Sequence, residues 1–154
     1  MRLYYLDTSA LIKHYVAEIG STWLETEVFG PDDVLALTSR VTMVEIWSAL
    51  ARRQREASIS SQHHAELLDA FREDCLIRYR FVEFEESVIE AARQLLERHP
   101  LRAYDAVQLA SALVAGSTLD ETSLPLPIFL CADDRLLAAA RVEGLPVDNP
   151  NSHP

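Results

Sequence analysis

Residues 4–13 read Tyr-Tyr-Leu-Asp-Thr-Ser-Ala-Leu-Ile-Lys, an apolar run that ends in one acid, Asp7, and then turns into a helical pattern. Residues 2–6 are expected to form a strand, and the unbroken apolar run over 3–6 is typical of burial on both faces, as in a parallel sheet. Asp7 then stands at the carboxyl end of a central strand, the edge at which α/β folds place their sites. The stretch predicts an α/β fold with a functional site beside Asp7.

Strand-like and helix-like segments alternate along the rest of the chain. Strands are expected at residues 34–38, 79–84, 128–132 and 146–147, and helices at 8–16, 20–29, 40–56, 60–76, 85–98, 103–115 and 133–143. A polar loop is expected from Gly116 to Pro127, and the tail over 149–154 is expected to fray. The alternation predicts one domain over 1–148, a three-layer α/β/α sandwich with a mainly parallel sheet.

Composition sets broad limits on function. The chain of 154 residues is 49% hydrophobic and 25% charged, ordinary values for a soluble globular domain. We expect no membrane span and no secretion signal, and two buried free thiols, Cys75 and Cys131, in a reducing cytoplasm. The net charge of -10 argues against a general nucleic-acid binder. The acidic excess is either a solvated surface or in part a cluster that needs cations.

Glu45 is the most anomalous acid in the sequence. It lies within residues 41–50, a helical segment that is apolar on most sides. An unpaired buried carboxylate costs several kcal/mol or takes up a proton. Glu45 therefore needs a partner, which is either a metal ion or an arginine such as Arg40 or Arg52.

Three further acids have simpler interpretations when each is taken alone. Asp7 and Asp133 each follow an apolar strand and precede a helix, so either could be an N-cap. Asp105 lies in a first helical turn, where the helix dipole favours acids. Asp133 shares its helical phase with the apolar stripe of its helix, whereas Asp134 faces outward.

Taken together, the four acids predict a metal site. Asp7 and Asp133 end buried strands at one edge of a parallel sheet, and the other two acids project inward from helices. Carboxylates packed this closely repel each other unless a cation neutralises them. Oxygen ligands favour Mg²⁺ or Mn²⁺ over zinc, and such a site can promote phosphodiester hydrolysis.

The same segments carry a resemblance to a known family. The chain resembles the PIN-domain ribonucleases, and more narrowly the VapC toxins of prokaryotic toxin–antitoxin pairs, over almost its whole length. The resemblance is carried by residues 6–13, Glu45, residues 104–110 and residues 131–136. The resemblance implies a PIN-like fold, a Mg²⁺- or Mn²⁺-dependent endoribonuclease, a homodimer and inhibition by a VapB-type antitoxin. It assigns the catalytic and metal-binding roles to Asp7, Glu45, Asp105 and Asp133, with Ser9 in support. One departure is Cys131, because many relatives carry a hydroxyl residue at this position.

Basic residues near these acids are candidates for RNA contact. They are Arg52, Arg53 and Arg55, with Lys13 and Arg102 as further candidates. The alternative for the three clustered arginines is a solvated helix end where cations suit the dipole.

Other functions remain as rivals. A catalytically silent PIN-fold module that binds RNA or protein is the main one, and a DNA-directed nuclease is another. Two phosphoryl-transfer classes fit poorly. Ser9 stands where a haloacid-dehalogenase phosphatase needs a second Asp, and the one lysine, Lys13, lies too early in the chain for a response-regulator receiver.

Overall fold

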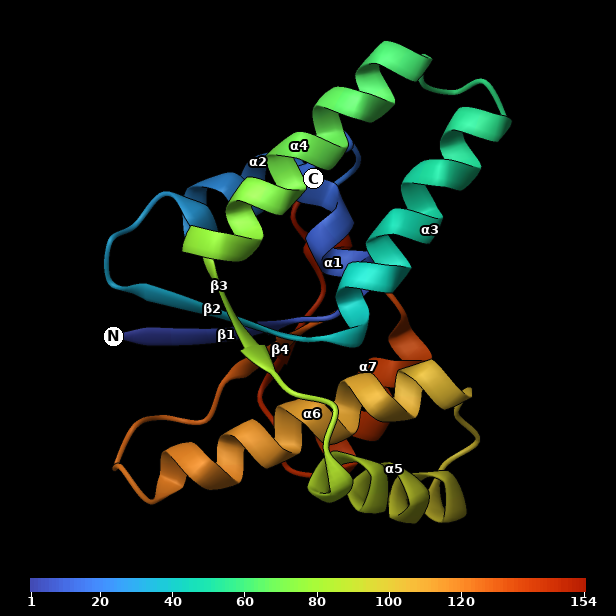
Figure 1. Cartoon of the computed structure of the whole chain (residues 1–154). Coiled ribbons are helices and arrows are strands. Elements are labelled where there is room, and N and C mark those ends of the chain that lie inside the picture. The colour runs from blue at the N-terminus through green and yellow to red at the C-terminus, as the bar shows by residue number, and fades with distance from the viewer.

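A five-stranded sheet forms the middle layer of the structure (Figure 1). The computed structural model describes all residues, 1–154. The strands are β1 (Arg2–Leu6), β2 (Val34–Ser39), β3 (Tyr79–Val82), β4 (Ile128–Leu130) and β5 (Val147–Asp148). Their order is β3-β2-β1-β4-β5, and every neighbouring pair is parallel. The chain leaves β1 toward β2 and later crosses back to β4, so the order reverses between β1 and β4, the place where open α/β sheets bind ligands.

Helices cover both faces of this sheet (Figure 1). One face carries α1 (Thr8–Leu11) with the 3-10 turn η1 (Ile12–His14), α2 (Ser21–Leu24) with the π-helical turn η2 (Glu25–Phe29), α3 (Val41–Arg55) and α4 (Ser61–Ile77). The other carries α5 (Glu86–Arg98), α6 (Ala103–Asp120) and α7 (Asp134–Val142), and the chain ends in a 3-10 turn, η3 (Pro150–Ser152). The three-layer α/β/α sandwich and the parallel sheet are therefore confirmed.

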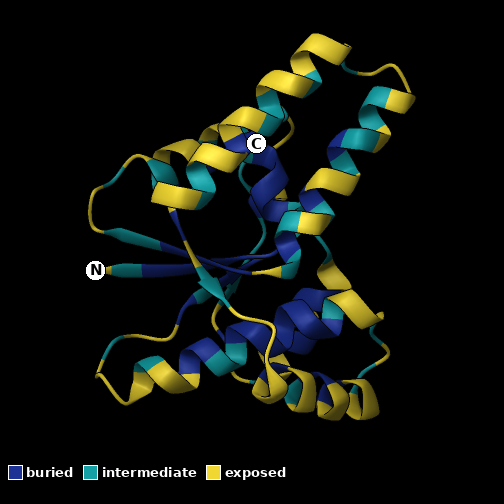
Figure 2. Ribbon diagram, in the orientation of Figure 1, coloured by how far each residue is buried: buried dark blue, intermediate teal, exposed yellow.

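The core has two parts, one on each side of the sheet. Successive strand residues point to opposite faces, so Tyr4 and Leu6 pack under α1–α4 while Tyr5 packs against α5–α7. Both faces of β1 are buried, as its unbroken apolar sequence predicts (Figure 2). This burial fixes the direction in which β1 delivers Asp7 to the edge of the sheet.

The loop was expected to begin at Gly116, but the helix before it is longer than predicted. Helix α6 continues to Asp120, because Leu119 still packs against the core and the Thr118 hydroxyl donates a hydrogen bond to the Val114 carbonyl at 3.1 Å. The polar residues of this turn therefore did not end the helix. A side chain at 116 would press on Leu126, whose Cδ2 lies 3.2 Å from the position of a Cβ.

The C-terminal residues do not fray. Pro150 is buried, and the His153 ring stacks on Trp23 with the ring centroids 4.1 Å apart. The same imidazole lies 3.0 Å from the Asp148 carboxylate. The tail is thus folded against α2.

Two smaller expectations also change. Both cysteines are free, but only Cys131 is buried, whereas Cys75 is partly exposed on α4. Strands β3 and β4 each end two residues earlier than expected. None of the helices is both long and apolar enough to cross a bilayer.

Candidate active site

A cavity of about 770 Å³ opens at the carboxyl ends of β1 and β4. All four predicted acids line it, and each comes from a different element: Asp7 from the end of β1, Glu45 from α3, Asp105 from the first turn of α6, and Asp133 from the N-cap of α7. The structure therefore brings together acids that are up to 126 positions apart in the sequence, counted from 7 to 133.

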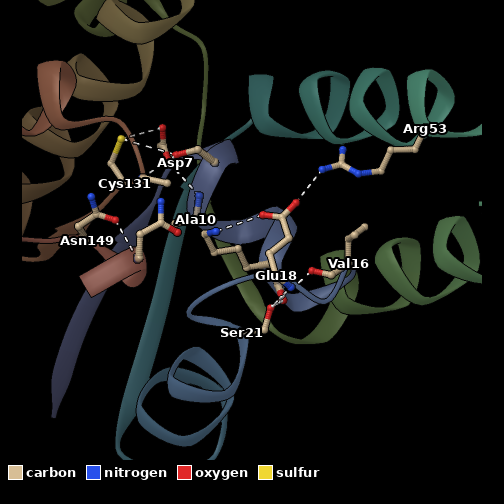
Figure 3. A network of polar contacts seen from close by, with 12 residues as sticks. Asp7, Ala10, Val16, Glu18, Ser21, Arg53, Cys131 and Asn149 are labelled. Atoms are coloured by element: carbon tan, nitrogen blue, oxygen red, sulfur yellow. Dashed lines mark hydrogen bonds and ion pairs between the residues drawn. The ribbon is translucent and has the colours of Figure 1, made fainter. Parts of the chain in front are cut away.

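Asp7 is the most buried of these acids, with 5% of its surface exposed. It caps α1 by accepting from the Ala10 amide at 3.1 Å, and the Ser9 hydroxyl donates to the same oxygen at 2.7 Å (Figure 3). Burial raises the pKa of Asp7 to about 6, and its hydrogen bonds and the nearby Glu45 charge act in opposite directions on this value. When no cation is bound, a fraction of Asp7 is therefore protonated and uncharged near neutral pH.

Cys131, the residue that follows β4, supports Asp7. Its thiol donates to the second carboxylate oxygen of Asp7 at 3.3 Å, and it accepts from the Asp133 amide at 3.2 Å. Burial raises the pKa of Cys131, so the sulfur keeps its proton and acts as a donor. The thiol thus provides a hydrogen bond where many relatives are expected to use a hydroxyl.

Glu45 is held by neutral donors. The Thr8 hydroxyl and the Gln108 amide each donate to its Oε1 at 2.8 Å. No arginine pairs with Glu45, and Arg40 instead binds Glu83 at 3.1 Å. The structure therefore contains no ion pair between Glu45 and an arginine. Glu45 is half-buried, not buried as expected, and it lines the cavity.

Asp105 and Asp133 each line the cavity and also make a local contact within their own helix end. Arg102 Nε lies 3.1 Å from Asp105 Oδ2, and the Asp133 carboxylate caps α7 by accepting from the Arg135 amide at 2.9 Å. Asp134 is exposed, as expected from its phase. Capping and cavity lining are compatible, because a carboxylate that accepts one amide hydrogen bond retains other lone pairs.

The predicted basic residues divide into two groups. Lys13, Arg52, Arg53 and Arg102 line the cavity, whereas Arg55 does not. Helix α3 supplies two of these cations from its last turns, and η1 supplies Lys13. The cavity therefore has an acidic part at the sheet edge and a basic part along α3.

The donor atoms of the acidic part suit a hard divalent cation. They are carboxylate oxygens, and His14 is not among them because its ring contacts Glu25 and Asp74 instead. No three metal-ligating side chains lie close enough to form a ready-made cluster. Binding an ion would therefore require these carboxylates to turn toward one another across the cavity.

Sequence reasoning missed the two residues that position Glu45, Thr8 and Gln108, of which Gln108 is the more buried. Gln108 is 2% exposed, and its amide donates to Glu45 and, at 2.9 Å, to Thr42. Its carbonyl accepts from the Tyr5 hydroxyl at 2.8 Å. The available signal was a single amide inside the strongly apolar segment 103–115, because a buried amide needs partners.

Comparisons with known proteins identify related sequences and a related fold. The model of the PIN domain family matches residues 4–144. Ribonuclease VapC45 of Mycobacterium tuberculosis is 39% identical over 118 residues, which cover 75% of this chain and 78% of the relative. Ribonuclease VapC35 of the same species is 30% identical over 146 residues, with 95% and 96% coverage. Among solved structures, a toxin-antitoxin complex from Klebsiella pneumoniae superimposes with a TM-score of 0.60 at 16% identity, covering 96% of this chain and 97% of that one.

Proposed function

Since the chain belongs to the PIN domain family and groups within it with the VapC ribonucleases, we propose that it is a metal-dependent endoribonuclease that hydrolyses RNA phosphodiester bonds. The observation that carries the proposal is that Asp7, Glu45, Asp105 and Asp133 all line one cavity at the switch point of the sheet. Two relatives that cover most of this chain carry the name ribonuclease, which supports RNA as the substrate.

The four acids would hold Mg²⁺ or Mn²⁺. The ion supplies Lewis-acid chemistry, which lowers the pKa of water and offsets charge on the reacting phosphate. Asp7 is positioned for this role by Ser9 and Cys131, and Glu45 is positioned by Thr8 and Gln108. The basic part of the cavity would attract and orient the RNA backbone.

The biological role we propose is that of the toxin in a toxin–antitoxin pair. The support is the kinship with VapC proteins and the shared fold with a chain of a toxin-antitoxin complex. A VapB-type antitoxin would then be the cognate partner. A homodimer and a cytoplasmic location are part of the same proposal.

The test of the enzymatic proposal is an RNA cleavage assay with the purified chain, freed of any antitoxin. We expect cleavage of a structured RNA with Mg²⁺ or Mn²⁺, loss of cleavage in EDTA, and loss in Asp7→Asn. The matched control is Asp134→Asn, because Asp134 is the exposed neighbour of Asp133 and does not line the cavity. Cleavage that survives both EDTA and Asp7→Asn would contradict the metal mechanism.

The same assay separates the rival functions. RNA binding without cleavage under every metal condition would favour the silent module, and cleavage of DNA but not RNA would favour a DNA-directed nuclease. Expression of the chain should arrest growth, and co-expression of the small protein encoded beside it should relieve the arrest. Growth that continues while active enzyme accumulates would contradict the toxin role.

A further inference from the structure

Glu18 occupies the centre of the basic part of the cavity. It lies in the loop between η1 and α2, and its carboxylate bridges two cations (Figure 3). Glu18 Oε2 lies 3.1 Å from Lys13 Nζ, and Glu18 Oε1 lies 2.8 Å from Arg53 Nη2. All three residues line the same cavity as the four acids. A carboxylate between two cations stands where a phosphate group would bind.

The two cations have little freedom to leave this contact. Lys13 is 5% exposed, and Glu18 is the one acid within ion-pair distance of its ammonium group. Arg53 is anchored by a hydrogen bond from its Nη1 to the Ala49 carbonyl at 3.3 Å. A buried ammonium needs an anion close by, so the space between Lys13 and Arg53 favours occupation by a negative group.

Glu18, in contrast, has a fixed backbone and a more accessible side chain. The Ser21 hydroxyl accepts from the Glu18 amide at 2.9 Å and donates to the Lys13 carbonyl at 2.8 Å. Gly20 has φ +88° and packs against Pro150, whose carbonyl oxygen would lie 2.2 Å from a Cβ at this position. The Glu18 side chain itself is 32% exposed. Its carboxylate can therefore swing toward solvent without moving the loop.

We propose that Lys13 and Arg53 form a subsite for a backbone phosphate of the RNA outside the cleaved bond, and that Glu18 fills this subsite until the phosphate displaces it. The inference rests on the proposed ribonuclease function. RNA is favoured over an acidic protein segment because the subsite opens into the cavity that holds the four acids, where the cleaved phosphate must lie, and Arg52 extends the same wall. Glu18 thus lowers the affinity for RNA, and its exchange for a phosphate keeps Lys13 compensated throughout.

The test measures RNA affinity in the full chain carrying Asp7→Asn, which prevents cleavage. The probe is a fluorescein-labelled RNA stem-loop, and fluorescence anisotropy gives the Kd. In this background Glu18→Gln should lower the Kd about two- to fivefold, the range that corresponds to the release of a partly exposed ion pair. The matched control is Glu27→Gln, which changes the net charge equally but removes a partner of Arg2 outside the cavity.

Arg53→Gln supplies the complementary arm. It should raise the Kd and flatten the dependence of log Kd on log salt concentration, because one phosphate contact is lost. In the Arg53→Gln background, Glu18→Gln should no longer tighten binding to the same extent. Thermal unfolding of each variant checks that the fold is retained.

Several results would overturn the inference. Equal effects of Glu18→Gln and Glu27→Gln would reduce it to general electrostatics, and weaker binding in Glu18→Gln would show that Glu18 only holds the cations in position. If a Glu-rich peptide binds more tightly to the Glu18→Gln variant while RNA does not bind, the subsite belongs to a protein partner. If neither the unsubstituted chain nor any variant binds or cleaves RNA, the proposed function is refuted as well. If the unsubstituted chain cleaves RNA but Glu18→Gln leaves the Kd unchanged, the inference alone is refuted.

Discussion

Replacing Asp7 with Asn should stabilise the metal-free protein at neutral pH while it abolishes cleavage. Asp7 is 5% exposed and pairs with no cation, and burial raises its pKa from 3.8 to about 6. A carboxyl whose folded-state pKa is raised favours the folded state when it is protonated, so this stability is present at low pH and is lost as the pH rises through about 6. The difference between the two pKa values corresponds to up to roughly 3 kcal/mol at neutral pH.

Asn removes the buried charge and keeps most of the local hydrogen bonds. Its carbonyl can still accept from Ser9 and Ala10, and only the acceptor facing Cys131 is lost. For a chain of this length, a gain of up to roughly 3 kcal/mol corresponds to a rise in Tm of about 6–10 °C. Near pH 4 the gain should fall below about 1 kcal/mol, because Asp7 is then protonated in the folded state of the unsubstituted chain as well.

The assay is thermal and urea unfolding in EDTA at about pH 7.5 and about pH 4, with Asp134→Asn as the control. Added Mg²⁺ or Mn²⁺ should reverse the order at neutral pH, because an ion that binds only the folded state stabilises it and Asp7→Asn weakens that binding. The reasoning is refuted if Asp7→Asn gives no gain at neutral pH in EDTA. A gain of the same size at both pH values would refute it as well, because the effect would then not come from the carboxylate charge.

Three further substitutions test how the site and its surroundings are held. Gln108→Ala should lower the free energy of unfolding by about 2–4 kcal/mol, because it leaves a cavity and unpaired buried hydroxyls, and it should slow cleavage because Glu45 loses a donor. Unchanged stability and an unchanged cleavage rate would show that Gln108 does not position the site. Gly20→Ala should cost at least about 1–3 kcal/mol in urea unfolding, because φ is +88° and Pro150 leaves no space; a loss below the error of the measurement would contradict this packing. Ser60→Ala should cost about 1 kcal/mol through loss of the α4 N-cap, with the cleavage rate unchanged, and a slower rate would link α4 to the site.

The sequence predicted the sheet and its order of elements because local patterns decide them. The unbroken apolar run of β1 required burial on both faces, and the structure places β1 at the centre of the sheet. The end of α6 and the C-terminal residues were predicted wrongly because both depend on distant contacts. Leu119 extends α6 by packing on the core, and His153 folds the tail by stacking on Trp23. Such contacts leave no periodic signal near the residues that they order.

The cavity residues show the same division. Asp133 and Glu45 both line the cavity as predicted, but Asp133 does so as the extended N-cap of α7 and not through a helical phase, and Glu45 is half-buried and not enclosed by an apolar helix. The neutral partners of Glu45, Thr8 and Gln108, were not predicted, because hydroxyl and amide groups are common and their pairing is set by how α1, α3 and α6 pack. The bridge from Glu18 to Arg53 likewise joins residues 35 positions apart and depends on the path of the loop after η1.

The most direct test of a divalent-metal site at these acids is anomalous diffraction from crystals soaked in Mn²⁺. We predict an anomalous peak in the cavity at a coordination distance of about 2 Å from a carboxylate oxygen of Asp7 and from at least one other of the acids. The peak should be absent from Asp7→Asn crystals treated in the same way. A cavity without a peak in the unsubstituted protein, or a peak that is equally strong in Asp7→Asn, would contradict the account.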